Sequence, residues 1–131
     1  MAYCTETELY SFLNLKLPFQ DIKDSLTTAI TVASAWIDAQ VNTELPATDT
    51  ELQTLAKEAC LFYAGSRILI QYWEKLQIDN YERDKIEQYE KRAKELVQAI
   101  IYRLKKIQDV IDDKDIEDQK FIPVLDYAIT E

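Results

Sequence analysis

The sequence from Asp49 to Leu76 reads DTELQTLAKEACLFYAGSRILIQYWEKL. Apolar and small residues recur in it at alternating steps of three and four, a spacing that places them on one face of an α-helix. The stripe consists of Leu52, Leu55, Ala59, Phe62, Ser66, Leu69, Trp73 and Leu76, while Tyr63, Ile68, Ile70 and Tyr72 lie outside it. A helix that is apolar over so much of its surface is expected at the centre of a bundle or of an oligomer. We therefore predict a central helix that begins at Asp49 or Thr50.

Two shorter helices are expected ahead of this central helix. Residues 5–8, Thr-Glu-Thr-Glu, have the spacing of a capping box, so a first helix should run from about Glu6 to Leu13. It should end before Pro18, because the residue ahead of a proline is pushed out of helical dihedrals. A second helix should begin between Asp21 and Ser25, where Asp and Ser side chains can cap it, and end near Val41.

A fourth helix should follow a break near Asp79-Asn80, because apolar residues recur at helical spacing from Ile86 to Ile107. The pattern predicts an all-α fold: a small helical bundle with two long antiparallel helices, two shorter N-terminal helices and an extended C-terminal arm. We expect residues 1–105 to form the helical domain and residues 106–131 to form the arm.

Composition restricts the class of protein. The chain has 131 residues, about one domain, with a hydrophobic fraction of 47% and a single glycine. Its formal net charge of -9 disfavours sequence-independent binding to a phosphate backbone or to an anionic membrane surface. The sequence has no apolar segment of about 20 residues, the length needed to span a bilayer, and no secretory leader. We expect a soluble protein that is not secreted.

The C-terminal arm carries most of the net charge. Residues 106–131 contain eight acidic and three basic residues, and so hold -5 of the formal -9. Residues 109–118 are interpreted as an acidic, solvated spacer outside the helical pattern. The apolar run at 121–127 should be covered by a partner, although it could instead fold back on its own bundle. The predicted partner-binding residues are Phe121, Ile122, Val124, Leu125 and Tyr127.

The sequence offers little catalytic chemistry. It contains no histidine, the commonest general base and transition-metal ligand, and one glycine cannot build a phosphate-binding loop. No spacing singles out a pair of carboxylates, and the acidic residues near Asp112 do not match a calcium loop. Cys4 and Cys60 are interpreted as an ordinary and a buried thiol, because they have no metal-site or disulfide-framework spacing. We expect no enzyme activity, no metal and no cofactor.

The N-terminal part of the chain resembles the head-tail adaptor proteins of tailed bacteriophages, also called head completion or connector proteins. The resemblance begins with Met1-Ala2-Tyr3-Cys4-Thr5 and a short helix ending in residues 12–15, Phe-Leu-Asn-Leu. It continues with an Ala- and Ser-rich helix ending in an acidic residue, here residues 33–38, and with the Leu45-Pro46 step. A long helix rich in Ala, Leu and Tyr follows, here residues 55–72.

This resemblance implies a function. Proteins of the family form a ring, commonly of twelve subunits, beneath the portal protein after DNA packaging and join the head to tail or stopper proteins. The chain would then be located in the virion neck after assembly in the host cytoplasm, and an acidic ring would let DNA pass without binding it. The alternative is an acidic regulatory or DNA-mimic protein that inhibits a basic host protein.

Overall fold

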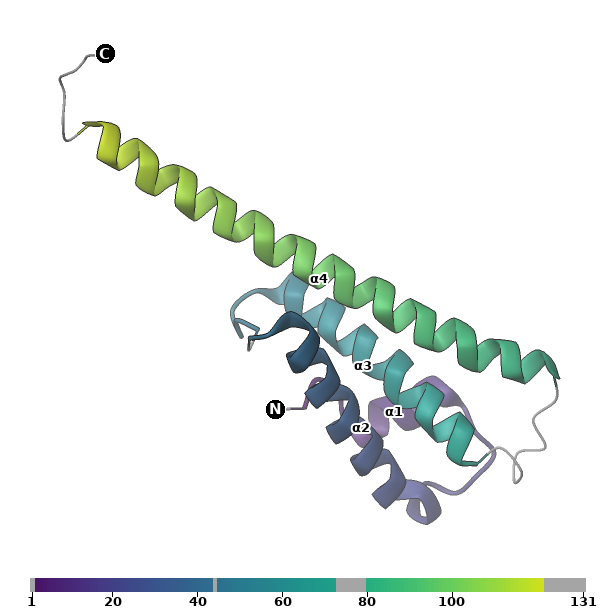
Figure 1. Cartoon of the computed structure of the whole chain (residues 1–131). Helices are drawn as coiled ribbons and strands as arrows, with labels where there is room; N and C mark the ends of the chain where they lie inside the picture. Colours follow the sequence, from purple (N-terminus) through teal and green to yellow (C-terminus); the bar gives the residue numbers. More distant parts are fainter. Residues whose placement is uncertain (1, 44, 73–79, 122–131) are drawn as a thin grey trace. The chain divides into compact units, whose positions relative to one another are not determined.

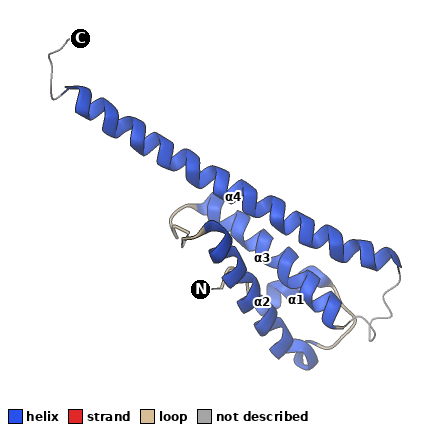
Figure 2. Ribbon diagram, viewed as in Figure 1, coloured by secondary structure: helices blue, strands red, loops and turns tan. Residues whose placement is uncertain are grey.

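The computed structural model describes the backbone of residues 2–43, 45–72 and 80–121, and the side chains of residues 2–43, 45–72 and 83–109. These residues form four α-helices, and none of them belongs to a β-strand (Figures 1 and 2). The prediction of an all-α fold is confirmed. The chain divides into two compact units, Met1–Ile100 and Ile101–Glu131, which are described separately.

The first helix, α1, runs from Glu6 to Leu13 as predicted. The Glu8 backbone N–H donates to Thr5 Oγ1 at 3.2 Å, and the Thr5 N–H donates to Glu8 Oε1 at 2.9 Å. This capping box satisfies backbone groups that the first helical turn leaves without partners. The helix ends at Asn14, which adopts a left-handed conformation with φ of 51° and donates its N–H to the Tyr10 carbonyl.

The second helix, α2, spans Phe19–Val41. Its end agrees with the prediction, but its start precedes the predicted range of residues 21–25. Pro18 stands at the N-cap with φ of -61°, and its carbonyl accepts the Asp21 N–H at 3.1 Å, so the helix begins directly after the proline. The buried side of α2 consists of Ile22, Leu26, Ala29, Ile30, Ala33, Ser34 and Ile37.

The third helix, α3, spans Thr50–Gln71 and begins where it was predicted, with Asp49 Oδ1 accepting the Leu52 N–H at 3.0 Å. It packs against both α1 and α2 (Figure 1). Its buried residues are Leu52, Ala56, Ala59, Cys60, Ala64, Gly65, Ser66, Ile68 and Leu69. Leu55 and Phe62 of the predicted stripe are only half-buried, whereas Ala56, Cys60, Ala64 and Ile68 outside it are buried, because the helix meets neighbours on two sides. Trp73 and Leu76 lie outside the described residues.

A close contact surrounds Gly65 in α3. A Cβ atom at this position would lie 3.2 Å from Leu13 Cδ2, 3.3 Å from Phe12 Cε2 and 3.5 Å from Tyr89 Cδ2. The Phe12 ring also packs against Phe62 and Tyr89, with ring centroids 5.1 and 5.4 Å apart. The single glycine of the chain therefore allows α3 to approach this aromatic cluster closely.

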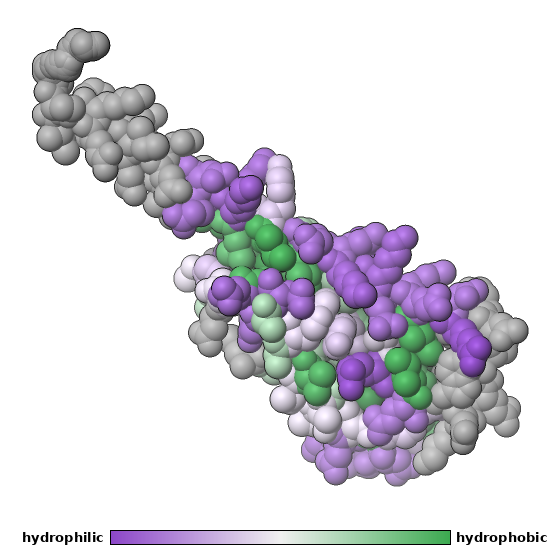
Figure 3. Space-filling view, viewed as in Figure 1, coloured by the Kyte–Doolittle hydropathy of each residue, from purple (hydrophilic) through white to green (hydrophobic). Residues whose placement is uncertain are grey.

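The fourth helix, α4, spans Asn80–Phe121. Within the first unit it buries Ile86, Ala93, Leu96, Val97 and Ile100. The side chains that α4 presents in Figure 3 are mostly hydrophilic. In the second unit, Tyr102 and Ile107 are its exposed large apolar side chains among the described residues.

The prediction that helical structure ends near residue 105, with a non-helical spacer at 109–118, is wrong. The backbone remains helical through Phe121. The physical reason is that residues 101–122 contain neither glycine nor proline, and charged residues tolerate a helix well. The described helix reaches Phe121, and no proline occurs in it to disfavour a helical conformation. The predicted domain boundary between residues 105 and 106 stays a prediction.

Candidate functional site

Phe121 is the one predicted partner-binding residue whose backbone the structure describes. Phe121 is the last residue of α4, and its side chain is not among those described. Ile122, Val124, Leu125 and Tyr127 lie outside the described residues. The described residues therefore do not test the assignment of these five residues as anchors, which stays a prediction.

A groove between α2 and α3 is one candidate interaction surface. It has a volume of about 320 Å³ and is lined by Ser25, Thr28, Ala29, Val32, Arg67, Ile70 and Gln71. One rim is ordered by hydrogen bonds, because Ser25 Oγ lies 2.7 Å from the Tyr72 hydroxyl and accepts from Gln71 Nε2 at 2.9 Å. Ile70 is 54% exposed beside it. The groove thus combines apolar and hydroxyl-bearing side chains.

Arg67 supplies the positive charge of this groove. Its side chain is exposed, and no ion pair joins it to another side chain that the structure describes. An Arg guanidinium at an apolar groove can bind a carboxylate through two parallel hydrogen bonds. The groove is therefore suited to an apolar segment that also carries a carboxylate. The sequence places Ile70 off the buried stripe and three residues after Arg67, on the same helical face, but it gave no sign that α2 would complete a groove there.

A second cluster forms where the first residues of the chain reach α2. The Tyr3 N–H donates to Ser34 Oγ at 3.2 Å, and the Tyr3 hydroxyl donates to Asp38 Oδ1. Both Tyr3 and Ser34 are buried. Residues 2–4 are thereby held against the middle of α2 before α1 begins.

Cys4 follows in the same segment and lies beside Cys60 of α3. The two Sγ atoms are 3.1 Å apart, both thiols are free, and both residues are buried. Ser34 Oγ lies 3.7 Å from Cys60 Sγ. Burial of Cys60 was predicted, but the position of Cys4 beside it was not, because 56 positions separate the two residues and no short-range spacing signals their contact.

Hydrogen bonding makes the two thiols unequal. Donation from the Cys4 thiol, and then from the Ser34 hydroxyl, holds the pKa of Cys60 below its ordinary value. The same bond between the two thiols, together with burial, raises the pKa of Cys4. Cys60 is thus the thiol more readily deprotonated.

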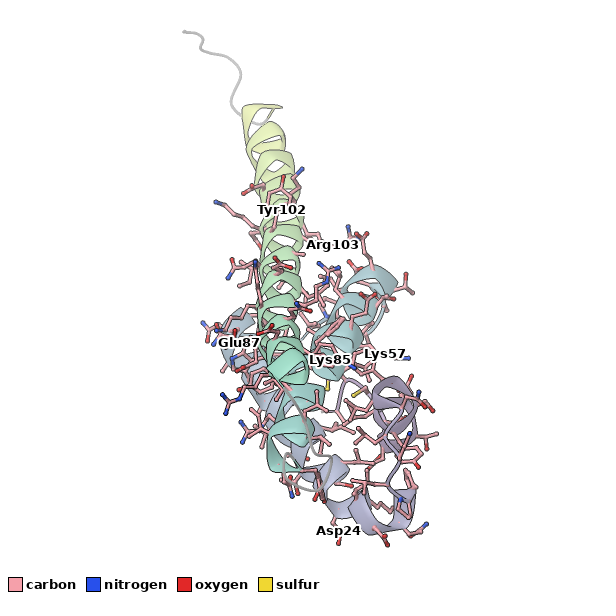
Figure 4. The ribbon with its side chains drawn as sticks, turned by 90° about the vertical axis from the view of Figure 1, so that its right-hand side faces the viewer. Asp24, Lys57, Lys85, Glu87, Tyr102 and Arg103 are labelled. Atoms are coloured by element: carbon pink, nitrogen blue, oxygen red, sulfur yellow. The ribbon has the colours of Figure 1, made fainter. Side chains whose placement is uncertain are left out.

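An ion pair lies close to this thiol pair. Lys57 Nζ is 2.6 Å from Glu8 Oε2, which joins α3 to the first turn of α1. The bond with Lys57, followed by the backbone N–H of Thr5, lowers the pKa of Glu8, and the same carboxylate raises the pKa of Lys57. In Figure 4 the sulfur atoms, drawn in yellow, lie near the labelled Lys57. The ion pair is partly exposed, so solvent screening limits its strength.

Comparisons with known proteins find no match for this chain. No protein-family model, no curated protein and no solved structure matches this chain. Among the side chains that the structure describes, no group of three or more His, Cys, Asp or Glu residues could hold a metal ion. None of the described helices combines the length and the apolar character needed to cross a membrane.

Proposed function

We propose that this chain is a virion structural protein, a head-tail adaptor that forms a ring under the portal and joins the capsid to tail or stopper proteins. One observation carries the proposal beyond the resemblance in sequence. Two separate segments that carry that resemblance, residues 1–5 and residues 33–38, contact each other through the bonds from Tyr3 to Ser34 and Asp38. They therefore belong to one structural unit rather than being independent similarities.

The prediction that both N-terminal helices are shorter is wrong for α2, which has 23 residues against 22 in α3. In this proposal α3 and α4 are antiparallel, and residues 106–131 form the C-terminal arm. The arm is helical as far as Phe121, so it begins as a stiff element rather than as a flexible spacer. Its predicted anchors Phe121, Ile122, Val124, Leu125 and Tyr127 would dock on the portal protein or on a neighbouring subunit.

A ring needs a heterologous interface, in which one surface of each subunit meets a different surface of the next. The groove between α2 and α3 is suited to one side of such an interface, because it offers the exposed Ile70 and the cationic Arg67. The acidic chain would repel the phosphates of DNA in the central channel, so that DNA passes without specific binding. The location would be the neck of the virion, after assembly in the host cytoplasm.

Electron microscopy of the purified chain, alone and mixed with the portal protein encoded in the same genome, tests the proposal. We expect rings alone, or rings that form on the portal. A chain that forms no ring and does not bind the portal, but binds a basic host protein, would favour the alternative of an acidic inhibitor.

Two sets of substitutions separate the role of the anchors from the role of charge. Serine at the five anchor positions should abolish attachment to the portal while leaving the helical circular dichroism of the bundle intact. The control places serine at five acidic positions of the arm and should retain attachment: Asp112, Asp113, Asp115, Glu117 and Asp118. Equal loss of attachment in both variants would contradict the assignment of the anchors.

A further inference from the structure

Cys4 and Cys60 are placed for direct reaction with each other. Their Sγ atoms are 3.1 Å apart, and a disulfide requires about 2 Å, so the sulfur atoms need to approach by only about 1 Å. Cys4 lies in the segment ahead of α1, and Cys60 lies within α3. This contact therefore joins two parts of the fold that are distant in sequence.

The surroundings assign different chemical roles to the two thiols. The Tyr3 N–H donates to Ser34 Oγ, which leaves the proton of the Ser34 hydroxyl available for Cys60 Sγ. Cys60 also accepts a hydrogen bond from the Cys4 thiol. Both donors stabilise a thiolate at Cys60, and the thiolate is the nucleophilic form of cysteine. Cys60 is suited to be the attacking thiol, and Cys4 to be the resolving thiol.

Access to the buried pair is available through the N-terminal segment. Residues 2–4 precede the first helix, and the described side-chain contact that ties them to α2 is made by Tyr3 with Ser34 and Asp38. Short segments outside the helices open locally at a lower free energy than the packed helical core. Detachment of these few residues would carry Cys4 into solvent and remove Tyr3 and Cys4 from beside the Cys60 thiol, without unfolding a helix.

We propose that Cys4 and Cys60 form a redox-active dithiol that closes to an intramolecular disulfide when a peroxide oxidises it. The Cys60 thiolate attacks one oxygen of hydrogen peroxide, and the O–O bond breaks. The departing hydroxide takes up the proton that the Cys60 thiol released, so Cys60 sulfenic acid and one water form. Cys4 sulfur then attacks the Cys60 sulfur, displaces the hydroxyl as a second water and forms the S–S bond. The two thiols lose two electrons in total, and the peroxide gains them. The product fixes the N-terminal segment to α3, and the inference does not rest on the proposed function.

The test treats the reduced, full-length chain with hydrogen peroxide after removal of the reductant. We expect the intact mass to fall by two hydrogen atoms, both thiols to become inaccessible to an alkylating reagent after denaturation, and a peptide map without reductant to join the peptides of Cys4 and Cys60. Dithiothreitol should restore both thiols. The same chain unfolded in urea serves as the control, because it shows that the peroxide can oxidise these thiols when they are exposed.

Variants test the assigned roles. Cys4→Ser should stop the reaction at Cys60 sulfenic acid, which dimedone captures, whereas Cys60→Ser should give no captured sulfenic acid at Cys4. Cys4→Ala provides the same readout if serine at this buried position prevents folding. Persistence of both thiols in the folded chain, under conditions that oxidise the unfolded chain, would overturn the proposal. A disulfide found only between two molecules would also overturn it.

Discussion

The substitution Gly65→Ala probes the packing of α3 against Phe12, Leu13 and Tyr89. Alanine in place of a glycine inside a helix stabilises the protein by about 0.5–1 kcal/mol, and a buried methyl group adds about 0.8 kcal/mol. The new Cβ would lie only 3.2 Å from Leu13 Cδ2 and 3.3 Å from Phe12 Cε2. Forcing well-packed side chains apart costs about 1–3 kcal/mol. The net change in the free energy of unfolding should therefore lie between a gain of about 1 kcal/mol and a loss of about 2 kcal/mol.

The steric part of this sum can be isolated with a second substitution. Leu13→Ala lowers the stability by about 2–5 kcal/mol on its own, but it removes the atom closest to the new Cβ. In that background Gly65→Ala should be more favourable than in the wild type by about 1 kcal/mol. Leu52→Ala is the control, because Leu52 is buried in the same helix but lies thirteen residues before Gly65, about 20 Å along the axis.

Urea unfolding followed by circular dichroism measures each free energy. With Leu52→Ala, the effects of the two substitutions should add within about 0.5 kcal/mol. If Gly65→Ala changes the unfolding free energy equally in the wild type and in the Leu13→Ala background, the steric explanation is refuted.

Three further predictions concern the helix ends and the ion pair. Thr5→Ala removes the capping hydroxyl of α1 and should lower the free energy of urea unfolding by about 1 kcal/mol, whereas Thr7→Ala, an exposed position inside the same helix, should not lower it. Because the folded-state pKa of Glu8 is lowered, its contribution to stability is complete above the unfolded-state pKa of about 4.3 and is lost as the pH falls through the folded-state pKa. The melting temperature of the wild type should thus fall more steeply below about pH 4.3 than that of Glu8→Gln. Parallel curves of melting temperature against pH would contradict this role. Asp113→Pro should reduce the helical circular dichroism relative to Asp113→Ala, because α4 includes residue 113; identical spectra would argue against a helix there.

The sequence allowed the number of helices and most of their ends to be predicted, because those features depend on local signals. In the capping box at Thr5 and in the Asp49 cap, for example, a side-chain oxygen accepts a hydrogen bond from the backbone N–H three residues later. The start of α2 was predicted late because candidate capping side chains were given more weight than Pro18. The end of α4 was predicted early because apolar periodicity weakens after Ile107, although no residue there breaks a helix until Pro123.

The candidate sites were harder to predict, because they depend on contacts between distant positions. The pairing of Cys4 with Cys60 follows from the packing of the N-terminal segment across α2 and α3, which no spacing in the sequence encodes. The groove beside Arg67 likewise requires the relative placement of two helices. Apolar periodicity placed both Ile68 and Ile70 outside the stripe, and so it could not predict that Ile68 is fully buried while Ile70 is exposed.

The helical backbone of residues 101–121 also has an angular consequence. Each residue of an α-helix advances the chain by about 1.5 Å and turns it by about 100°. Loss or gain of one residue in this segment would therefore rotate the end of the described helix by about 100°, while the length of the helix would change by only about 1.5 Å. A change of seven residues would extend or shorten the segment by about 10 Å and nearly preserve the direction. The angular position of Phe121, the last described residue of α4, is thus set by residue count as well as by residue identity.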